Sequence, residues 1–222
     1  MTQLTYPDFR RAVVLSDFGE ADKLSIRDIP MPTFRPDEML VRVKATSVNP
    51  IEWKMRRGLG LPKPVWRMLI GRPMILGIDF SGTVVAKGSN VTGYQIGDDV
   101  MGAFRLWGAD AEYVVVRLRS RHTAVALKPS SVSYAEAGAV SFAGLLAFAG
   151  MSTHSRLTTK ANARVLVIGA SGESAIWQFR LPSAPWEPRL LSVCAAARTR
   201  SLCGNPVPTK SSHTTGHHWK VC

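Results

Sequence analysis

The stretch from Val165 to Gly172 constrains the fold more than any other part of the chain. Residues 165–168 are four apolar residues in a row, which predicts a strand buried on both faces, as in the centre of a parallel sheet. The next four residues are all small: Gly169, Ala170, Ser171 and Gly172. Small residues there let the backbone approach a pyrophosphate at the N-terminus of the following helix. The stretch therefore predicts the first strand and turn of a nucleotide-binding unit.

The composition is that of a globular protein. Hydrophobic residues make up 45% of the 222 residues, which is enough for a packed core in one large or two small domains. The chain starts without a basic segment followed by an apolar core, and no apolar run approaches the length of a membrane span. All three cysteines lie in the last 50 residues, so a disulfide framework is not indicated. We expect a soluble, cytoplasmic protein with no membrane partner.

The charge of the chain leaves two interpretations open. The formal net charge is +12, and no acid occurs between Glu52 and Asp79, where six basic residues stand: Lys54, Arg56, Arg57, Lys63, Arg67 and Arg72. Trp53 and Trp66 lie among them, and basic residues with aromatic ones are typical of nucleic-acid surfaces. Scattered surface charge is the simpler interpretation. We favour it, because nothing in the stretch resembles a nucleic-acid-binding module.

Short strands dominate the first 128 residues. Apolar or alternating runs bounded by Gly, Pro, Asn and Asp predict strands over residues 11–16, 23–29, 39–45, 78–87, 99–104, 112–116 and 124–127. A short helix is expected over residues 51–57, and residues 58–73, which are rich in Gly and Pro, are expected to form an irregular loop. Many short strands with Gly turns favour a compact, barrel-like β domain.

A helix is predicted to begin at Tyr134. Ser133 and Glu136 fit the capping box S-x-x-E, in which each side chain satisfies a backbone N–H of the other residue. The helix is rich in Ala and Gly from residue 137 to 144, which suits close packing against a neighbour. Residues 145–151 continue its pattern.

Five stretches, in this order, resemble the medium-chain dehydrogenase/reductase superfamily, in its zinc-free quinone oxidoreductase branch. They are residues 45–54 (ATSVNPIEWK), 77–84 (GIDFSGTV), 97–100 (GDDV), 143–145 (AGL) and 165–172 (VLVIGASG), within about residues 10–172. The resemblance implies an α/β protein, with a GroES-like β-barrel domain over residues 1–128. Residues 129–172 would form a linker helix and the first strand of a Rossmann domain. It also implies hydride transfer from NADPH to a quinone or an activated C=C bond.

The resemblance implies a role for several residues. Asn49 would lie near the nicotinamide, and Lys54 could place a positive charge near a developing enolate. Gly144 and Leu145 would line the nicotinamide pocket, and the cofactor's pyrophosphate would lie on Gly169, Ala170, Ser171 and Gly172. The residues alone leave simpler interpretations open: Asn49 as a turn residue, Lys54 as a solvated helix residue, and Gly144 and Leu145 as helix packing.

No metal site is expected. Zinc-dependent relatives need Cys and His ligands, whereas the resembling positions here carry Val48, Asn49 and Asp79. No Cys occurs before Cys194, so the four-cysteine loop of those relatives is absent as well. We interpret Asp79 as a structural residue.

The resemblance stops at Gly172. The family continues with Gly-Gly-Val-Gly, but here Glu173 would place a carboxylate where the pyrophosphate should lie. Reading the third base of each codon with the first two of the next permits Gly-Val-Gly and then segments like the family's next helix and strand. Our hypothesis is that a missing base or a misjoined exon near Gly172 puts residues 173–222 out of frame. We expect a disordered tail, a strand at 165–168 without parallel neighbours, and impaired NADPH binding.

Three functions are consistent with the sequence. The first is an oxidoreductase for a small quinone or enone, impaired by the loss of most of its cofactor domain. The second is a non-enzymatic GroES-like binding module or an inactive remnant. The third is a basic nucleic-acid binder. We favour the first and expect no nucleic-acid partner, while the sequence leaves the oligomeric state open.

Overall fold

The structure is a computed structural model that describes residues 6–60, 62–70, 73–104, 108–118, 120, 122–151, 164–168 and 189–194. The chain divides into two compact units, Met1–Phe142 and Ala143–Cys222. The boundary falls within the helix α3 (Tyr134–Ala149). The elements before α3 are β1 (Phe9–Leu15), the 3₁₀ helix η1 (Ala21–Lys23), β2 (Leu24–Pro30), β3 (Glu38–Ala45), α1 (Pro50–Arg56), α2 (Lys63–Ile70), β4 (Met74–Ile75), β5 (Asp79–Lys87), β6 (Asp99–Phe104), β7 (Tyr113–Arg117) and β8 (Thr123–Leu127).

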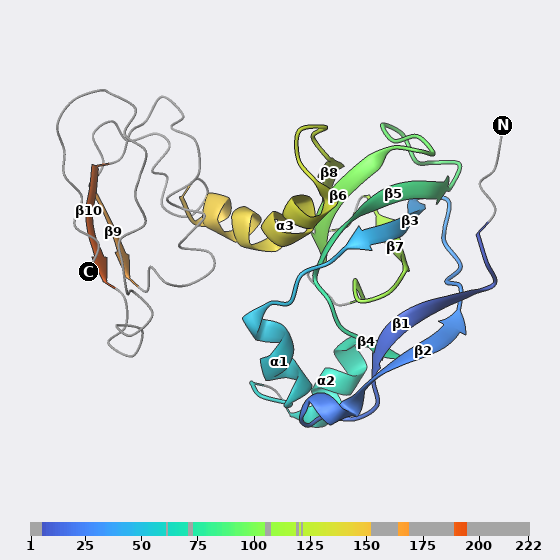
Figure 1. The fold of residues 1–222 in the computed structure, drawn as a ribbon, viewed down its shortest axis with the longest axis horizontal. Coiled ribbons are helices and arrows are strands. Elements are labelled where there is room, and N and C mark those ends of the chain that lie inside the picture. The colour runs from blue at the N-terminus through green and yellow to red at the C-terminus, as the bar shows by residue number, and fades with distance from the viewer. Residues whose placement is uncertain are drawn as a thin grey trace. The chain divides into compact units, whose positions relative to one another are not determined.

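Two antiparallel sheets make up the β part of the first unit (Figure 1). The larger has the strand order β7-β3-β5-β6-β8, and the smaller has the order β2-β1-β4. β5 is central, pairing with β3 on one side and with β6 on the other. The seven strands predicted from the sequence all occur, and the two-residue strand β4 is added. The prediction of a barrel-like β domain is confirmed.

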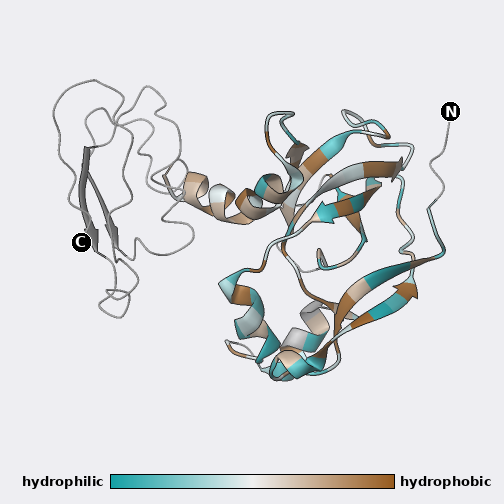
Figure 2. Ribbon diagram, viewed as in Figure 1, coloured by the Kyte–Doolittle hydropathy of each residue, from teal (hydrophilic) through white to brown (hydrophobic). Residues whose placement is uncertain are grey.

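The main apolar core is formed mostly by side chains from the strands of the larger sheet. Its members are buried and come from five segments of the chain: Met39, Val41, Phe80, Val84, Val100, Phe104, Ala109, Val114 and Val116. The rings of Phe80 and Phe104 stack with centroids 4.9 Å apart. A second cluster joins helix α1 to the smaller sheet, because Met55 of α1 packs against Leu15 of β1 and against Phe18. Figure 2 shows hydrophobic and hydrophilic residues interspersed along β1 and β2, as expected for strands with one face in contact with the core.

The helix α2 corrects one expectation. Residues 58–73 were predicted to be an irregular loop, but Lys63–Ile70 is helical. Pro64 stands in the first turn, where a helix tolerates proline because that backbone N–H has no partner within the helix. The residues from Val65 to Ile70 then contain neither Gly nor Pro. The density of Gly and Pro over the whole stretch concealed this short uninterrupted run.

The start of α3 is as predicted. The backbone N–H of Ser133 donates to Glu136 Oε2 at 2.9 Å, and the backbone N–H of Glu136 donates to Ser133 Oγ at 3.2 Å, which completes the capping box. Hydrogen bonds then attach this first turn to β5, since Ser81 Oγ donates to the carbonyl of Tyr134 at 2.6 Å. The capped end of α3 is thereby fixed on the strand that carries the polar residues described below.

Two strands are described beyond α3, in the second unit. β9 (Arg164–Ile168) and β10 (Arg189–Cys194) pair in parallel. A strand was predicted at residues 165–168, and β9 confirms it. β10 corrects the expectation that this strand would lack a parallel neighbour, and that the tail would be disordered over these six residues. Its apolar run, Leu190, Leu191, Val193 and Cys194, is a strand signal in its own right. The other residues of the predicted tail, 173–188 and 195–222, lie outside the described residues.

None of the helices among the described residues is long and apolar enough to cross a membrane.

Candidate functional site

A group of buried polar residues lies where the loop after β3 meets the start of β5. Asn49, Glu52 and Asp79 are only 1%, 3% and 0% exposed. Asn49 stands immediately before α1, Glu52 lies in its first turn, and Asp79 is the first residue of β5. Polar side chains so deeply buried are costly unless they hydrogen-bond to one another, so their contacts decide what the group can do. We call Ser47, Asn49, Glu52 and Asp79 the polar cluster.

The side-chain amide of Asn49 is at the centre of the polar cluster. Its Nδ2 lies 2.8 Å from Asp79 Oδ2, 3.1 Å from Glu52 Oε1 and 3.2 Å from Ser47 Oγ. An amide nitrogen carries two hydrogens, so it cannot donate fully to three acceptors at once. Asn49 Oδ1 is buried and accepts no hydrogen bond from the described residues. Three acceptors therefore surround an Nδ2 that has only two hydrogens to donate, whereas Oδ1 could still accept a hydrogen bond.

Asp79 is held from three sides. Ser47 Oγ donates to Asp79 Oδ2, and the backbone N–H of Phe142 in α3 donates to Asp79 Oδ1. With the bond from Asn49, both carboxylate oxygens are occupied. Asp79 thus links the loop after β3, the strand β5 and the helix α3. The interpretation of Asp79 as structural agrees with these contacts.

A third acid, Asp110, adjoins the polar cluster through Thr46. Thr46 Oγ1 lies 2.7 Å from the carbonyl oxygen of Asp79 and 3.3 Å from Asp110 Oδ1. Gly77 lets the backbone of Asp110 lie close to the segment before β5. It has φ +87°, and a Cβ there would meet the backbone nitrogen of Asp110 at 2.4 Å. Only glycine combines that conformation with so close a contact.

Burial changes the proton affinity of these acids. Desolvation raises the pKa of Glu52 to about 7, against hydrogen bonding from Asn49, which lowers it. Desolvation likewise raises the pKa of Asp110 to about 6, and it raises the pKa of Asp79 above its ordinary value. The charges of Asp110 and Asp79 further disfavour ionisation of Glu52. Near neutral pH, Glu52 is therefore poised between its protonated and ionised forms.

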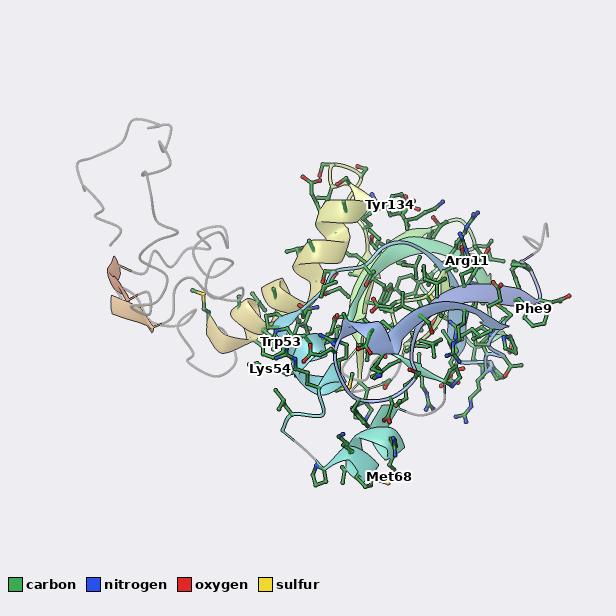
Figure 3. The ribbon with its side chains drawn as sticks, turned by 60° about the horizontal axis from the view of Figure 1, so that its bottom comes forward. Phe9, Arg11, Trp53, Lys54, Met68 and Tyr134 are labelled. Carbon is green, nitrogen blue, oxygen red and sulfur yellow. The ribbon has the colours of Figure 1, made fainter. Side chains whose placement is uncertain are left out.

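Lys54 lies outside the polar cluster. On α1, Glu52 and Met55 are buried. Trp53 and Lys54, which are labelled in Figure 3, are exposed. Lys54 Nζ lies 5.8 Å from the centroid of the Trp53 ring, a cation–π distance. Of the two residues predicted to be catalytic, the structure places Asn49 inside the cluster and Lys54 on the solvent side of the same helix.

The predicted cofactor residues fall in the second unit. Gly144 is half-buried and Leu145 exposed, with 45% of its surface accessible, and both lie in α3. Gly169, Ala170, Ser171 and Gly172 lie outside the described residues. Among the residues that are described, no group of three or more His, Cys, Asp or Glu could hold a metal ion.

Sequence reasoning missed Glu52, Ser47 and Asp110 as site residues. One signal for Glu52 was present: it stands three residues after Asn49, the spacing of a helix cap and its partner. The link to Asp79 had no local signal, because 30 residues separate it from Asn49 and only the sheet brings the two together.

Comparison with known proteins identifies the class of this fold and site. Residues 35–129, which include the polar cluster, match the family model described as the alcohol dehydrogenase GroES-like domain. The quinone oxidoreductase from Coxiella burnetii is similar in structure, with a TM-score of 0.70 and 27% sequence identity over 87% of this chain and 59% of that one.

Curated relatives agree with that class. The chain is 31% identical to human "NAD(P)H oxidoreductase RTN4IP1, mitochondrial", over 83% of this chain and 49% of the relative. It is also 31% identical to tomato (Solanum lycopersicum) "2-methylene-furan-3-one reductase", over 77% of this chain and 43% of the relative. The chain belongs to the medium-chain dehydrogenase/reductase superfamily, in its quinone oxidoreductase-like branch. It spans about half the length of these curated relatives.

Proposed function

We propose that this chain carries the catalytic domain of a nicotinamide-dependent oxidoreductase that reduces a small quinone or an activated C=C bond. The observation that carries the proposal is the polar cluster, in which the buried Asn49 amide holds an unused acceptor beside an acid of displaced pKa. Relatives named for quinone, furanone and NAD(P)H chemistry support it.

NADPH is the cofactor we propose, and when bound it would supply the hydride. The parallel pair of β9 and β10 fits such a group, because dinucleotide-binding folds begin with two parallel strands joined by a phosphate-binding turn and a crossover helix. The residues that would hold it are Gly144 and Leu145 on α3 and the turn Gly169, Ala170, Ser171 and Gly172. Glu173, directly after that turn, is the reason we expect the chain as it stands to bind NADPH weakly.

The polar cluster would manage the proton that such a reduction consumes. A reduced enone or quinone is an anion until it takes up a proton, and an acid with a pKa near the working pH supplies one most effectively. Glu52, with a pKa of about 7, has that property. Asn49 lies between Glu52 and Asp79 and would position the substrate oxygen through its side-chain amide.

Lys54 would act from outside the polar cluster. Its ammonium is exposed, so it is free to approach the negative charge that develops on a substrate oxygen. Asn49 and Lys54 therefore stay the proposed catalytic residues, with distinct roles: Asn49 as a fixed hydrogen-bonding group and Lys54 as an exposed positive charge.

Two comparisons test the proposal. The chain and a version with one base restored near codon 172 are each assayed for loss of NADPH absorbance with a small quinone and an enone. The restored version is expected to turn over, and its Asn49→Ala variant to be slower by about 10²-fold. Absence of turnover in the restored version, with a stable protein complex instead, would favour the binding-module alternative. A salt-sensitive shift of arbitrary DNA would favour the nucleic-acid alternative.

The cytoplasmic location expected from the sequence stays a prediction. The human relative is named as mitochondrial, which is a statement about that protein.

A further inference from the structure

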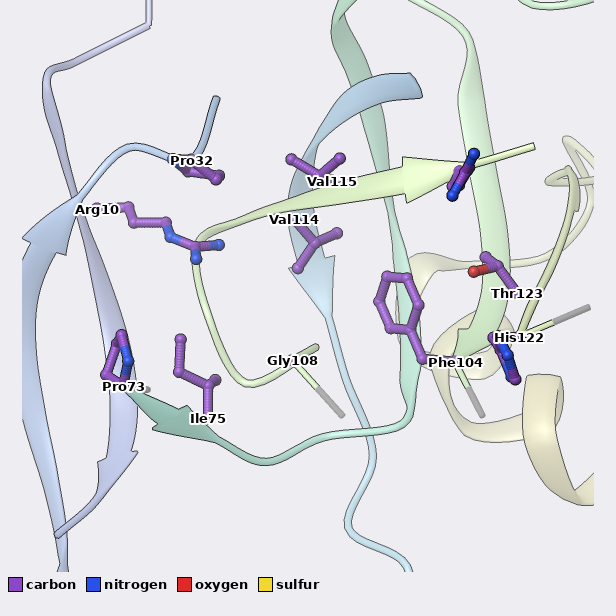
Figure 4. Close-up of a pocket in the computed structure, with 11 residues that line it drawn as sticks. Arg10, Pro32, Pro73, Ile75, Phe104, Gly108, Val114, Val115, His122 and Thr123 are labelled. Carbon is purple, nitrogen blue, oxygen red and sulfur yellow. The ribbon is translucent and has the colours of Figure 1, made fainter. Parts of the chain in front are cut away.

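A cavity lies in the first unit, apart from the residues of the polar cluster. Its volume is about 310 Å³, and none of the polar-cluster residues lines it. The wall combines polar and apolar side chains and comes from both sheets. Its apolar part includes Ile75 of β4, Phe104 of β6, and Val114 and Val115 of β7 (Figure 4). A space of that size holds a molecule of roughly ten non-hydrogen atoms or several waters.

Two nitrogen groups in the wall of this cavity lack partners. Arg10 Nε and His122 Nδ1 are both buried and form no hydrogen bond with any described residue. Figure 4 shows Arg10 reaching in from β1 and His122 at the opposite end, beyond Phe104. Buried polar groups in native proteins nearly always have a partner, so two orphans in one cavity point to something that the cavity binds.

The charge of Arg10 is also uncompensated. One of its nitrogens donates to the carbonyl of Tyr113, which is neutral, and the described residues offer it no ion pair. Only two of the chain's 16 acids, Glu173 and Glu187, lie outside the described residues. The neighbouring cation in the wall, Arg117, already has an acid, since its Nε donates to Asp37 Oδ2 at 2.9 Å. Burial lowers the pKa of Arg10, because desolvation disfavours its charged form. A bound anion would stabilise that charged form.

We propose that this cavity binds a small organic carboxylate with an apolar body. The carboxylate would accept from the guanidinium of Arg10, whose planar fork matches two carboxylate oxygens. The apolar body would lie against Ile75, Phe104 and Val114. His122 Nδ1 would meet a polar group, or a retained water, at the far end. The site is independent of the proposed redox function, because it shares no residue with the polar cluster.

The test is calorimetric titration of the full chain with octanoate as the probe and with octanol as its uncharged counterpart. Octanoate is expected to bind saturably with one molecule per chain, and octanol at least about 10-fold more weakly, since a charge-assisted hydrogen bond discriminates by that factor or more. This comparison needs no variant, so it stands even where a substitution impairs folding. Absence of saturable octanoate binding, or equal binding of octanol, would overturn the proposal and leave a water-filled cavity.

Variants of Arg10 locate the site. Arg10→Met, which keeps the length of the side chain but removes its charge, is expected to weaken octanoate binding at least about 10-fold, and Arg10→Lys is expected to weaken it less. The matched control is Arg27→Met, at an exposed arginine on the adjacent strand β2, which should bind octanoate as the parent does. Inorganic phosphate is the second probe. Binding of phosphate with no binding of octanoate, or octanoate binding unchanged in Arg10→Met, would contradict the proposed ligand class or its site.

Discussion

The two sides of β5 bury side chains of opposite character. Phe80 and Asp79 are consecutive residues and both are fully buried. Phe80 stacks on Phe104 in the apolar core, whereas Asp79 accepts hydrogen bonds from Ser47, Asn49 and the backbone of Phe142. An apolar core stabilises a fold by removing area from water, but a polar cluster at best recovers the hydrogen bonds that burial costs.

This difference indicates what each side contributes. The Phe80 side is closely packed: a Cβ on Gly102 would meet the Phe80 ring at 2.7 Å. The Asp79 side leaves Asn49 Oδ1 unpaired and displaces the pKa of Glu52 to about 7. A fold that needed only stability would have little reason to keep such a cluster, since apolar residues of similar volume are often at least as stabilising. This contrast is consistent with a stabilising role for the Phe80 side, and it supports the proposal that the polar cluster on the Asp79 side serves chemistry.

The largest effect is expected on the apolar side. Phe80→Ala should lower the free energy of unfolding by about 3–5 kcal/mol, because it empties a packed site. Phe9→Ala is the control, since Phe9 is 59% exposed on β1 and should cost well under 1 kcal/mol. Denaturant titration of both variants gives the comparison. Similar losses in the two would show that the sheet core is not where stability resides.

The next effect concerns pH. Burial raises the pKa of Glu52 from 4.5 to about 7, so between these values the folded state binds the proton that the unfolded state has lost. Stability from this group is therefore complete below about pH 4.5 and is lost as the pH rises through 7. Glu52→Gln cannot ionise and so does not show this loss. Between pH 5 and pH 8, the free energy of unfolding of the variant should therefore rise relative to that of the parent by up to about 3 kcal/mol.

Unfolding curves of the parent and Glu52→Gln at pH 5 and pH 8 measure this difference. Asp110 and Asp79, whose pKa values are also raised, remain in both proteins, so the desolvation of these two acids contributes to both sets of curves. A constant difference between the two proteins across this range would contradict a displaced pKa at Glu52.

A smaller effect is expected from one hydrogen bond of the polar cluster. Ser47→Ala removes the donor to Asp79 Oδ2 and should lower the free energy of unfolding by about 1–2 kcal/mol. It should also raise the pKa of Asp79 further, because that bond favours the ionised form. The loss should accordingly be greater at pH 8 than at pH 5. The exposed Ser89→Ala serves as the control.

The smallest effect is expected at the surface. Arg117 and Asp37 form an ion pair of 2.9 Å with 48% and 33% of their side-chain surfaces exposed. A double-mutant cycle with alanine should give a coupling energy of about 0.2–1 kcal/mol that declines as salt is added. A coupling above about 2 kcal/mol, insensitive to salt, would mean that this surface contributes as much as the buried cluster does.

The sequence predicted what local signals determine. The strand around Phe80 followed from its apolar run, and the start of α3 from the spacing of Ser133 and Glu136. α2 was missed because the whole of residues 58–73 was predicted to be a loop from its high content of Gly and Pro. β10 was missed because residues 173–222 were treated as one out-of-frame segment, although Arg189–Cys194 contains its own apolar run.

The candidate site was predictable only in part. Asn49 was found through the family motif and Asp79 was interpreted as structural, but the contact between them was not predicted, because residues 30 positions apart leave no trace in local spacing. Glu52 was missed although it stands only three residues after Asn49. The orphan nitrogens of Arg10 and His122 are likewise a consequence of three-dimensional packing, since more than 100 positions separate the two residues in the chain.

The most direct test of the contrast along β5 is the titration of the Glu52 carboxyl itself. Side-chain carboxyl ¹³C shifts of the labelled protein would be followed from pH 4 to 9, with the Glu52→Gln variant used to assign the resonance. The account predicts a midpoint of about 7 for Glu52, because it is buried beside Asp79 and Asp110. A midpoint near the ordinary value of 4.5 would contradict it, and would mean that the polar side of β5 is solvated and carries no poised proton.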